Sequence, residues 1–128
     1  MIDRYTTVRM RNIWSMKNRW NLFLDVELAY LEALEEDKIA TPGQAKKIKD
    51  LVTIDPDRIA ALEQTLRHDV IAFLTHVEEQ AGEATRFLHY GLTSSDVLDT
   101  VFALQLKQAT AYILEEMSNL TDALDELA

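Results

Sequence analysis

The chain has 128 residues, of which 48% are hydrophobic, a formal net charge of −9 and no cysteine. That length suits one domain with a modest core, and the composition is that of neither a disordered segment nor a membrane protein. The negative charge argues against nonspecific nucleic-acid binding, and the lack of cysteine excludes disulfides and thiolate metal sites. No apolar run reaches the roughly 20 residues that span a bilayer, and residues 1–11 lack the apolar core of a signal peptide. We therefore expect a cytoplasmic protein that binds neither a membrane nor nucleic acid.

The charges are unevenly distributed along the chain. Residues 1–20 contain five basic side chains and one acid, Asp3, whereas residues 96–128 contain seven acids and one base, Lys107. An anionic ligand would therefore be met near the N-terminus. Ordinary solvated surface bases explain the same pattern about equally well.

Almost every segment has a helical pattern and no alternation of period two indicates a strand, so the predicted fold class is all-α. Residues 22–37 carry apolar side chains on more than one face, which predicts a buried helix. The segment Thr41–Gln44 predicts a helix start, with its threonine as cap, its proline in the first turn and its glutamine closing a capping box. Asp55 followed by Pro56 predicts a further start by the same logic.

The next apolar stripe runs from Ile59 to Val77 and ends at Gly82, a typical helix stop. The stripe fits one continuous helix over residues 56–80. It also fits two helices separated by a break near residues 65–69. The periodicity alone leaves both arrangements open.

The segment His89–Thr100 places an imidazole, a glycine, hydroxyl groups and carboxylates at the predicted start of a long helix. Thr93, Ser94 or Ser95 would cap this helix and leave backbone N–H groups that suit a phosphate or a carboxylate. The alternative is that the hydroxyl groups are only caps and that the two aspartates of the segment complement the helix dipole. Those aspartates argue against an anion unless they are turned away or neutralised.

The last segment predicts a long bundle helix over residues 96–128. Its apolar residues recur at a mean interval of about 3.6, the period of a straight helix; they are Leu98, Phe102, Leu106, Ala109, Ile113, Met117, Leu120, Leu124 and Leu127. A stripe of this length needs packing partners that the preceding residues do not clearly supply. Self-association through residues 96–128 is one way to cover it.

The remaining candidates favour structural explanations. The three histidines, His68, His76 and His89, have no metal-ligand spacing, so no metal site is predicted. His76 is interpreted as a surface or packing residue. Trp14 and Trp20 are interpreted as core anchors rather than base-stacking platforms.

Four segments of the chain together resemble a known enzyme family. They are Met1–Tyr5 (MIDRY), Ile13–Ser15 (IWS), Thr65–Val70 (TLRHDV) and His89–Asp96, which has the pattern H-x-G-x-T-S-x-D. The last pattern resembles the fumarase/aspartase superfamily of lyases. All the segments together, in this order and spacing, resemble its adenylosuccinate lyase family.

The resemblance implies an all-α fold in which residues 1–92 form an N-terminal helical domain and residues 93–128 begin a truncated central bundle. It implies a cytoplasmic homotetramer of longer chains, which uses no cofactor. That enzyme eliminates fumarate from the nucleotide adenylosuccinate, giving AMP, and from the succinyl-carboxamide intermediate of purine synthesis. The principal acid and base of this elimination would lie outside these 128 residues, so we expect an inactive N-terminal fragment.

The resemblance also implies roles for individual residues, and it favours the break near residues 65–69. Arg4 and Tyr5 match positions that hold the nucleotide phosphate, and His89 matches a position on the phosphate side. Thr93 and Ser94 match contacts to the succinyl portion. The substrate-binding segment corresponds to Arg67, His68 and Asp69, with His68 assisting near the reacting groups.

Two alternatives differ in what they require. A free-standing acidic interaction module would explain the apolar stripe of residues 96–128 but has no need for the matched segments. Another fumarate-releasing lyase of the superfamily would keep the pattern at His89–Asp96 and should lack the segments at Arg4 and His68.

Overall fold

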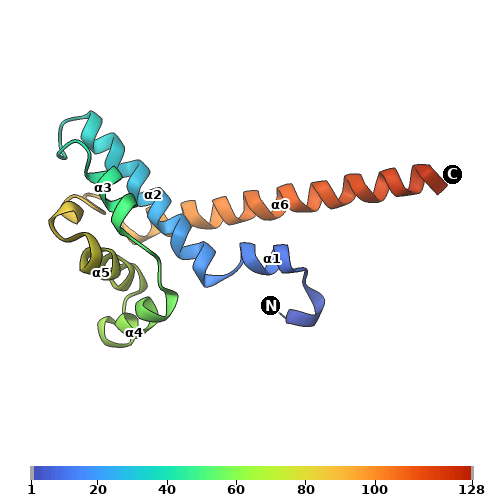
Figure 1. Cartoon of the computed structure of the whole chain (residues 1–128), viewed down its shortest axis with the longest axis horizontal. Helices are drawn as coiled ribbons and strands as arrows, with labels where there is room; N and C mark the ends of the chain where they lie inside the picture. Colours follow the sequence, from blue (N-terminus) through green and yellow to red (C-terminus); the bar gives the residue numbers. More distant parts are fainter. Residues whose placement is uncertain (1, 128) are drawn as a thin grey trace.

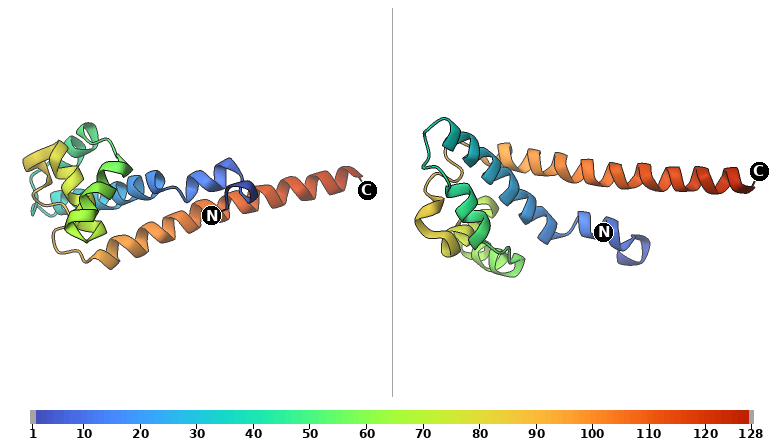
Figure 2. Two further views of the ribbon diagram at one scale, coloured as in Figure 1. Left: turned by 90° about the horizontal axis from the view of Figure 1, so that it is seen from below. Right: turned by 45° about the horizontal axis from the view of Figure 1, so that its top comes forward.

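The computed structural model describes residues 2–127, and within that range every regular element is helical. The predicted all-α fold is therefore confirmed. The elements are η1 (Asp3–Tyr5), α1 (Val8–Ile13), α2 (Met16–Glu36), α3 (Gln44–Leu51), α4 (Pro56–Leu66), α5 (Asp69–Ala81), η2 (Gly82–Thr85) and α6 (Ser94–Leu127). Helices α2 to α5 form a cluster at one end of the molecule, and α6 extends far beyond it (Figures 1 and 2). None of the described helices is long and apolar enough to cross a membrane.

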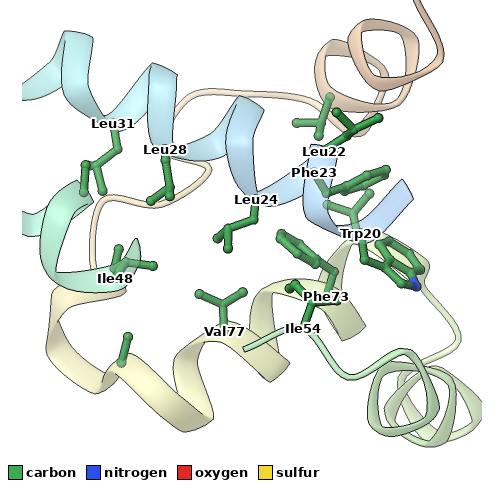
Figure 3. Close-up of a cluster of buried hydrophobic side chains, with 14 of the residues drawn as sticks. Trp20, Leu22, Phe23, Leu24, Leu28, Leu31, Ile48, Ile54, Phe73 and Val77 are labelled. Atoms are coloured by element: carbon green, nitrogen blue, oxygen red, sulfur yellow. The ribbon is translucent and has the colours of Figure 1, made fainter. Parts of the chain in front are cut away.

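Helix α2 is the centre of the core, as its apolar faces predict. Its buried residues face α3, α5 and the start of α6 (Figure 3). Trp20, Phe23 and Phe73 form an aromatic cluster: the rings of Trp20 and Phe73 are stacked with centroids 5.8 Å apart, and Phe23 meets both edge-on. Trp20 is thus a core anchor, as predicted. Trp14 is only half-buried, against Phe102 on α6, so that prediction was wrong for Trp14.

Two of the predicted helix boundaries are confirmed. Asp55 caps α4, because its carboxylate accepts hydrogen bonds from the backbone N–H groups of Asp57 and Arg58. Helix α5 ends at Ala81, and Gly82 follows with φ +55° and ψ −133°, a conformation that favours glycine.

The predicted cap of α3 was wrong. The helix begins at Gln44, with Gly43 in the N-cap position at φ +86° and without a capping side chain of its own. The Glu35 carboxylate, from the end of α2, instead accepts hydrogen bonds from the backbone N–H groups of Gly43 (2.8 Å) and Ala45 (2.7 Å). A carboxylate from another helix has replaced the expected threonine, and it also ties α2 to α3.

His76 is a packing residue of α5, as one of the two interpretations held. Only 4% of it is exposed. Its Nε2 lies 3.2 Å from both the Asp55 backbone nitrogen and the Thr53 carbonyl oxygen, and 3.1 Å from the Gln80 amide nitrogen. The ring therefore fastens the loop between α3 and α4 to α5.

Helix α6 is as long as predicted, but its buried face differs from the predicted stripe. Along its first half the buried residues are Val97, Val101, Gln105 and Ala109, which face α1 and α2. Most of the predicted stripe is exposed: Phe102 (54%), Leu106 (44%), Ile113 (50%), Met117 (58%), Leu120 (61%), Leu124 (57%) and Leu127 (85%). The expectation that the preceding residues leave the stripe uncovered is confirmed within the described part of the chain.

Candidate functional site

The most enclosed ionisable pair among the described residues joins α2 to the loop before α6. Glu27 is fully buried, and its two carboxylate oxygens contact the same residue, His89. Oε1 lies 2.5 Å from His89 Nδ1, and Oε2 accepts a hydrogen bond from the His89 backbone N–H at 2.8 Å. His89 has φ +60°, a left-handed conformation that is unusual for a residue other than glycine. One contact holds the His89 backbone in place and the other fixes the orientation of its ring.

Burial raises the pKa of the Glu27 carboxyl, and the hydrogen bonds and charge of His89 oppose that rise. A carboxylate without solvent costs free energy unless hydrogen bonds compensate it, and here His89 supplies them. The sequence prediction missed Glu27. The available signal was its position four residues from both Phe23 and Leu31, which are fully buried on the same helix.

The start of α6 does not present a free anion site. Thr93 precedes the first helical residue, Ser94, and both its backbone N–H (2.7 Å) and its hydroxyl group (3.0 Å) donate to the Asp96 carboxylate. These hydrogen bonds, the backbone one foremost, lower the pKa of Asp96, and the charge of His89 adds a small effect in the same direction. Asp96 therefore stays ionised, so the condition that the sequence set for an anion site, an aspartate turned away or neutralised, is not met at Asp96. Its carboxylate also occupies the helix end that a free anion would use.

The break between α4 and α5 is confirmed. Helix α4 ends at Leu66, Arg67 takes the left-handed conformation at φ +55°, and α5 begins at Asp69 with His68 as its N-cap. The His68 Nδ1 accepts a long hydrogen bond, 3.4 Å, from the Ile71 backbone N–H. Both Arg67 and His68 are exposed at this junction.

Arg19 from α2 supports the same junction. Its guanidinium group lies 3.4 Å from the Asp69 carboxylate and over the rings of Trp20 and Phe23. Asp69 also accepts a hydrogen bond from the Val70 backbone N–H at 2.8 Å. Asp69 is therefore held by structural contacts. Arg19, which the sequence prediction did not assign to this junction, links it to the aromatic core.

Arg4 and Tyr5 lie near the middle of α6 instead of its start. Both are exposed, and the Arg4 guanidinium group lies 4.7 Å from the centre of the Tyr5 ring. Tyr5 lines an open apolar groove with Tyr112 and Met117 of α6. The ribbon likewise places the N-terminal segment alongside α6 (Figure 2).

The predicted site residues therefore occupy three separate places. Ser94 and Tyr112 are separated along α6 by about 27 Å at the helical rise of 1.5 Å per residue. His89 lies beside the first of these positions and Tyr5 beside the second. The two segments are too far apart for one phosphate group to touch both within a single copy of the chain. The junction at His68, between α4 and α5, forms the third place.

Comparison with known proteins gives consistent results. The chain is 45% identical to adenylosuccinate lyase of Synechocystis sp. over 124 residues, which cover 97% of this chain and 29% of that protein. It is 38% identical to adenylosuccinate lyase of Staphylococcus saprophyticus over all 128 residues, or 30% of that protein. It is 41% identical to adenylosuccinate lyase of Streptococcus mutans over 119 residues, which cover 93% of this chain and 28% of that protein. The chain thus spans less than a third of the length of these relatives.

A solved structure shares the fold. The fumarate lyase from Mesorhizobium sp. BNC1 superposes with a TM-score of 0.81 over 90% of this chain and 28% of that one, at 23% sequence identity. A family model described as lyase matches residues 11–128. From the match over nearly its whole length we conclude that the chain belongs to this lyase family.

Proposed function

We propose that the chain forms the N-terminal part of an adenylosuccinate lyase. The observation that carries this proposal is the 38–45% identity to adenylosuccinate lyases over 93–100% of the chain. The complete enzyme would act in the cytoplasm on adenylosuccinate and on the succinyl-carboxamide intermediate of purine synthesis, without a cofactor. Residues 1–92 would form its N-terminal domain and residues 93–128 the start of its central bundle.

The proposed reaction is an elimination that breaks a C–N bond. A base removes a proton from the carbon beside a carboxylate, the C–N bond electrons move to nitrogen, and an acid protonates the departing amine as fumarate forms. The principal acid and base would lie outside these 128 residues. This chain would supply groups that bind the substrate, because guanidinium and imidazole donate charge-assisted hydrogen bonds to anions.

We assign Arg4 and Tyr5 to the nucleotide phosphate and His89 to the phosphate side. The assignment needs more than one copy of the chain, because the Tyr5 and His89 segments lie at positions about 27 Å apart along α6. Thr93 and Ser94 would contact the succinyl portion, which requires the two donors of Thr93 to leave the Asp96 carboxylate. The junction of Arg67, His68 and Asp69, where the first two side chains are exposed, would complete the site, with His68 assisting.

Assembly into a homotetramer through α6 would bring these segments together. The second half of α6 is exposed, and its apolar residues Ile113, Met117, Leu120 and Leu124 are each at least half accessible. Burying a stripe of this kind against other helices is a usual way to form a bundle. Sedimentation of the 128-residue chain with and without the double change Leu120→Glu and Leu124→Glu tests this step: we expect association in the wild type only.

The enzymatic proposal is tested on the complete polypeptide from the source organism. We expect it to release fumarate from adenylosuccinate and to bind AMP more tightly than small dicarboxylates. Arg4→Ala should weaken AMP binding about tenfold or more, as for a lost charge-assisted hydrogen bond, whereas Lys47→Ala, an exposed base on α3, should not change it. A native product of 14.7 kDa, or equal affinity for all the ligands, would refute the proposal.

A further inference from the structure

The contact between Glu27 and His89 has a geometry that cap or packing roles do not require. Both oxygens of a fully buried carboxylate are directed at one residue. The backbone contact alone would satisfy the His89 N–H and stabilise its left-handed conformation. The second contact, 2.5 Å from Oε1 to Nδ1, acts only on the ring.

This contact determines which ring nitrogen carries the proton. An ionised carboxylate can only accept, so His89 Nδ1 must be the donor. Nδ1 is covered by Glu27, while 16% of the His89 side chain is exposed to solvent. Nε2 is therefore the ring nitrogen that remains for a ligand. When both ring nitrogens are protonated, Nε2 carries the second proton and can donate to an anion.

We infer that Glu27 is a positioning residue for His89: it keeps the proton on Nδ1 and directs Nε2 to an anionic group of the ligand. The assignment of the ligand rests on the proposed function, whereas the state of the ring does not. Among the described residues the charged groups around His89 are Glu27 on α2 and Asp96 on α6, and Asp96 is already held by Thr93.

His68 provides an internal contrast. Its Nδ1 accepts a hydrogen bond from the Ile71 backbone N–H, so in the neutral ring the proton must be on Nε2. The two histidines are therefore expected in opposite tautomers. The chain contains only three histidines, which makes their ring nitrogens separable in one spectrum.

The first test is ¹⁵N NMR of the 128-residue chain labelled at histidine, recorded across a pH titration. In the neutral rings we expect the proton on Nδ1 of His89 and on Nε2 of His68. In Glu27→Gln the amide oxygen can accept from the His89 backbone N–H while the amide nitrogen donates to Nδ1. An Nδ1 that accepts has no proton, so the Nε2–H tautomer should appear. A neutral wild-type His89 with its proton on Nε2 would overturn the inference, and this result needs no variant to fold.

The second test uses the complete lyase and compares Glu27→Gln with Glu32→Gln, which removes an exposed carboxylate from the same helix. We expect Glu27→Gln to raise KM for adenylosuccinate about tenfold, as for one weakened charge-assisted hydrogen bond, with kcat within about twofold. Glu32→Gln should change neither. An unchanged KM in an active Glu27→Gln enzyme would overturn the ligand part of the inference. Failure of the wild type to cleave adenylosuccinate would instead refute the proposed function and leave the NMR result intact.

Discussion

Phe73 is the side chain whose loss should most clearly separate the core from the exposed part of this molecule. It is fully buried, stacks on Trp20 with centroids 5.8 Å apart and meets Phe23 edge-on at 5.4 Å. Phe73→Ala leaves a cavity between α2 and α5 that two rigid rings cannot easily fill. Substitutions of this kind cost about 3–5 kcal/mol of unfolding free energy, a large part of the 5–15 kcal/mol typical of a domain.

The assay is urea denaturation followed by far-ultraviolet circular dichroism, at concentrations where sedimentation shows a monomer. Phe102→Ala is the matched control, because Phe102 is 54% exposed and contacts only the half-buried Trp14 ring among aromatic groups of the described residues. Its cost should stay below about 1 kcal/mol. The reasoning fails if Phe73→Ala costs less than Phe102→Ala, because burial would then not decide the stability of this cluster.

Three further changes test single features of the fold. Glu35→Ala should lower the unfolding free energy by about 1–2 kcal/mol, because the N-terminus of α3 loses its cap of two hydrogen bonds. Glu36→Ala, which changes an exposed neighbour, should have little effect. Equal losses of unfolding free energy in urea denaturation would contradict the capping role. Gly82→Ala should cost about 1–3 kcal/mol of strain at φ +55°, although space for the new methyl group exists, so an unchanged melting temperature would show that the turn relaxes. Glu27→Gln tests the pH dependence of stability. The folded-state pKa of Glu27 is raised above 4.5, so the folded state binds the Glu27 proton more tightly than the unfolded state does. The wild type therefore loses stability as the pH rises through that folded-state pKa. The variant should lack this loss, and parallel stability-versus-pH curves for the two proteins would refute the raised pKa.

Local sequence patterns determined the helical elements of this protein. The cap at Asp55, the stop at Gly82 and the long helix after residue 93 depend on residues close to each other along the chain, so their effect does not require the rest of the fold. The break at Arg67 and His68 was different, since its apolar periodicity continues through both helices. Only the resemblance to a family favoured two helices there, and the left-handed Arg67 confirms them.

The candidate site was predicted in part. The sequence indicated that the two aspartates of this segment argue against an anion, and Asp96 does stay ionised, held by the donors of Thr93. The roles of Arg4, His68 and His89 in binding remain predictions. Their distribution over three places could not be foreseen, because separation in space depends on how α1 and α4 pack against α2 and α6.

What only the tertiary structure decided is which side chains meet across helices. Glu35 replaces the expected threonine cap of α3 because the end of α2 lies beside it. The buried face of α6 contains Val101 and Gln105, whereas the neighbouring Phe102 and Leu106 are exposed. Either face carries enough apolar side chains to be buried, and the packing of α1 and α2 selects one of them. Glu27 finds His89, 62 residues away in the sequence, for the same reason. Helix formation is local, whereas burial and pairing depend on the angle at which the helices pack, and the periodicity of a single chain contains no information about that angle.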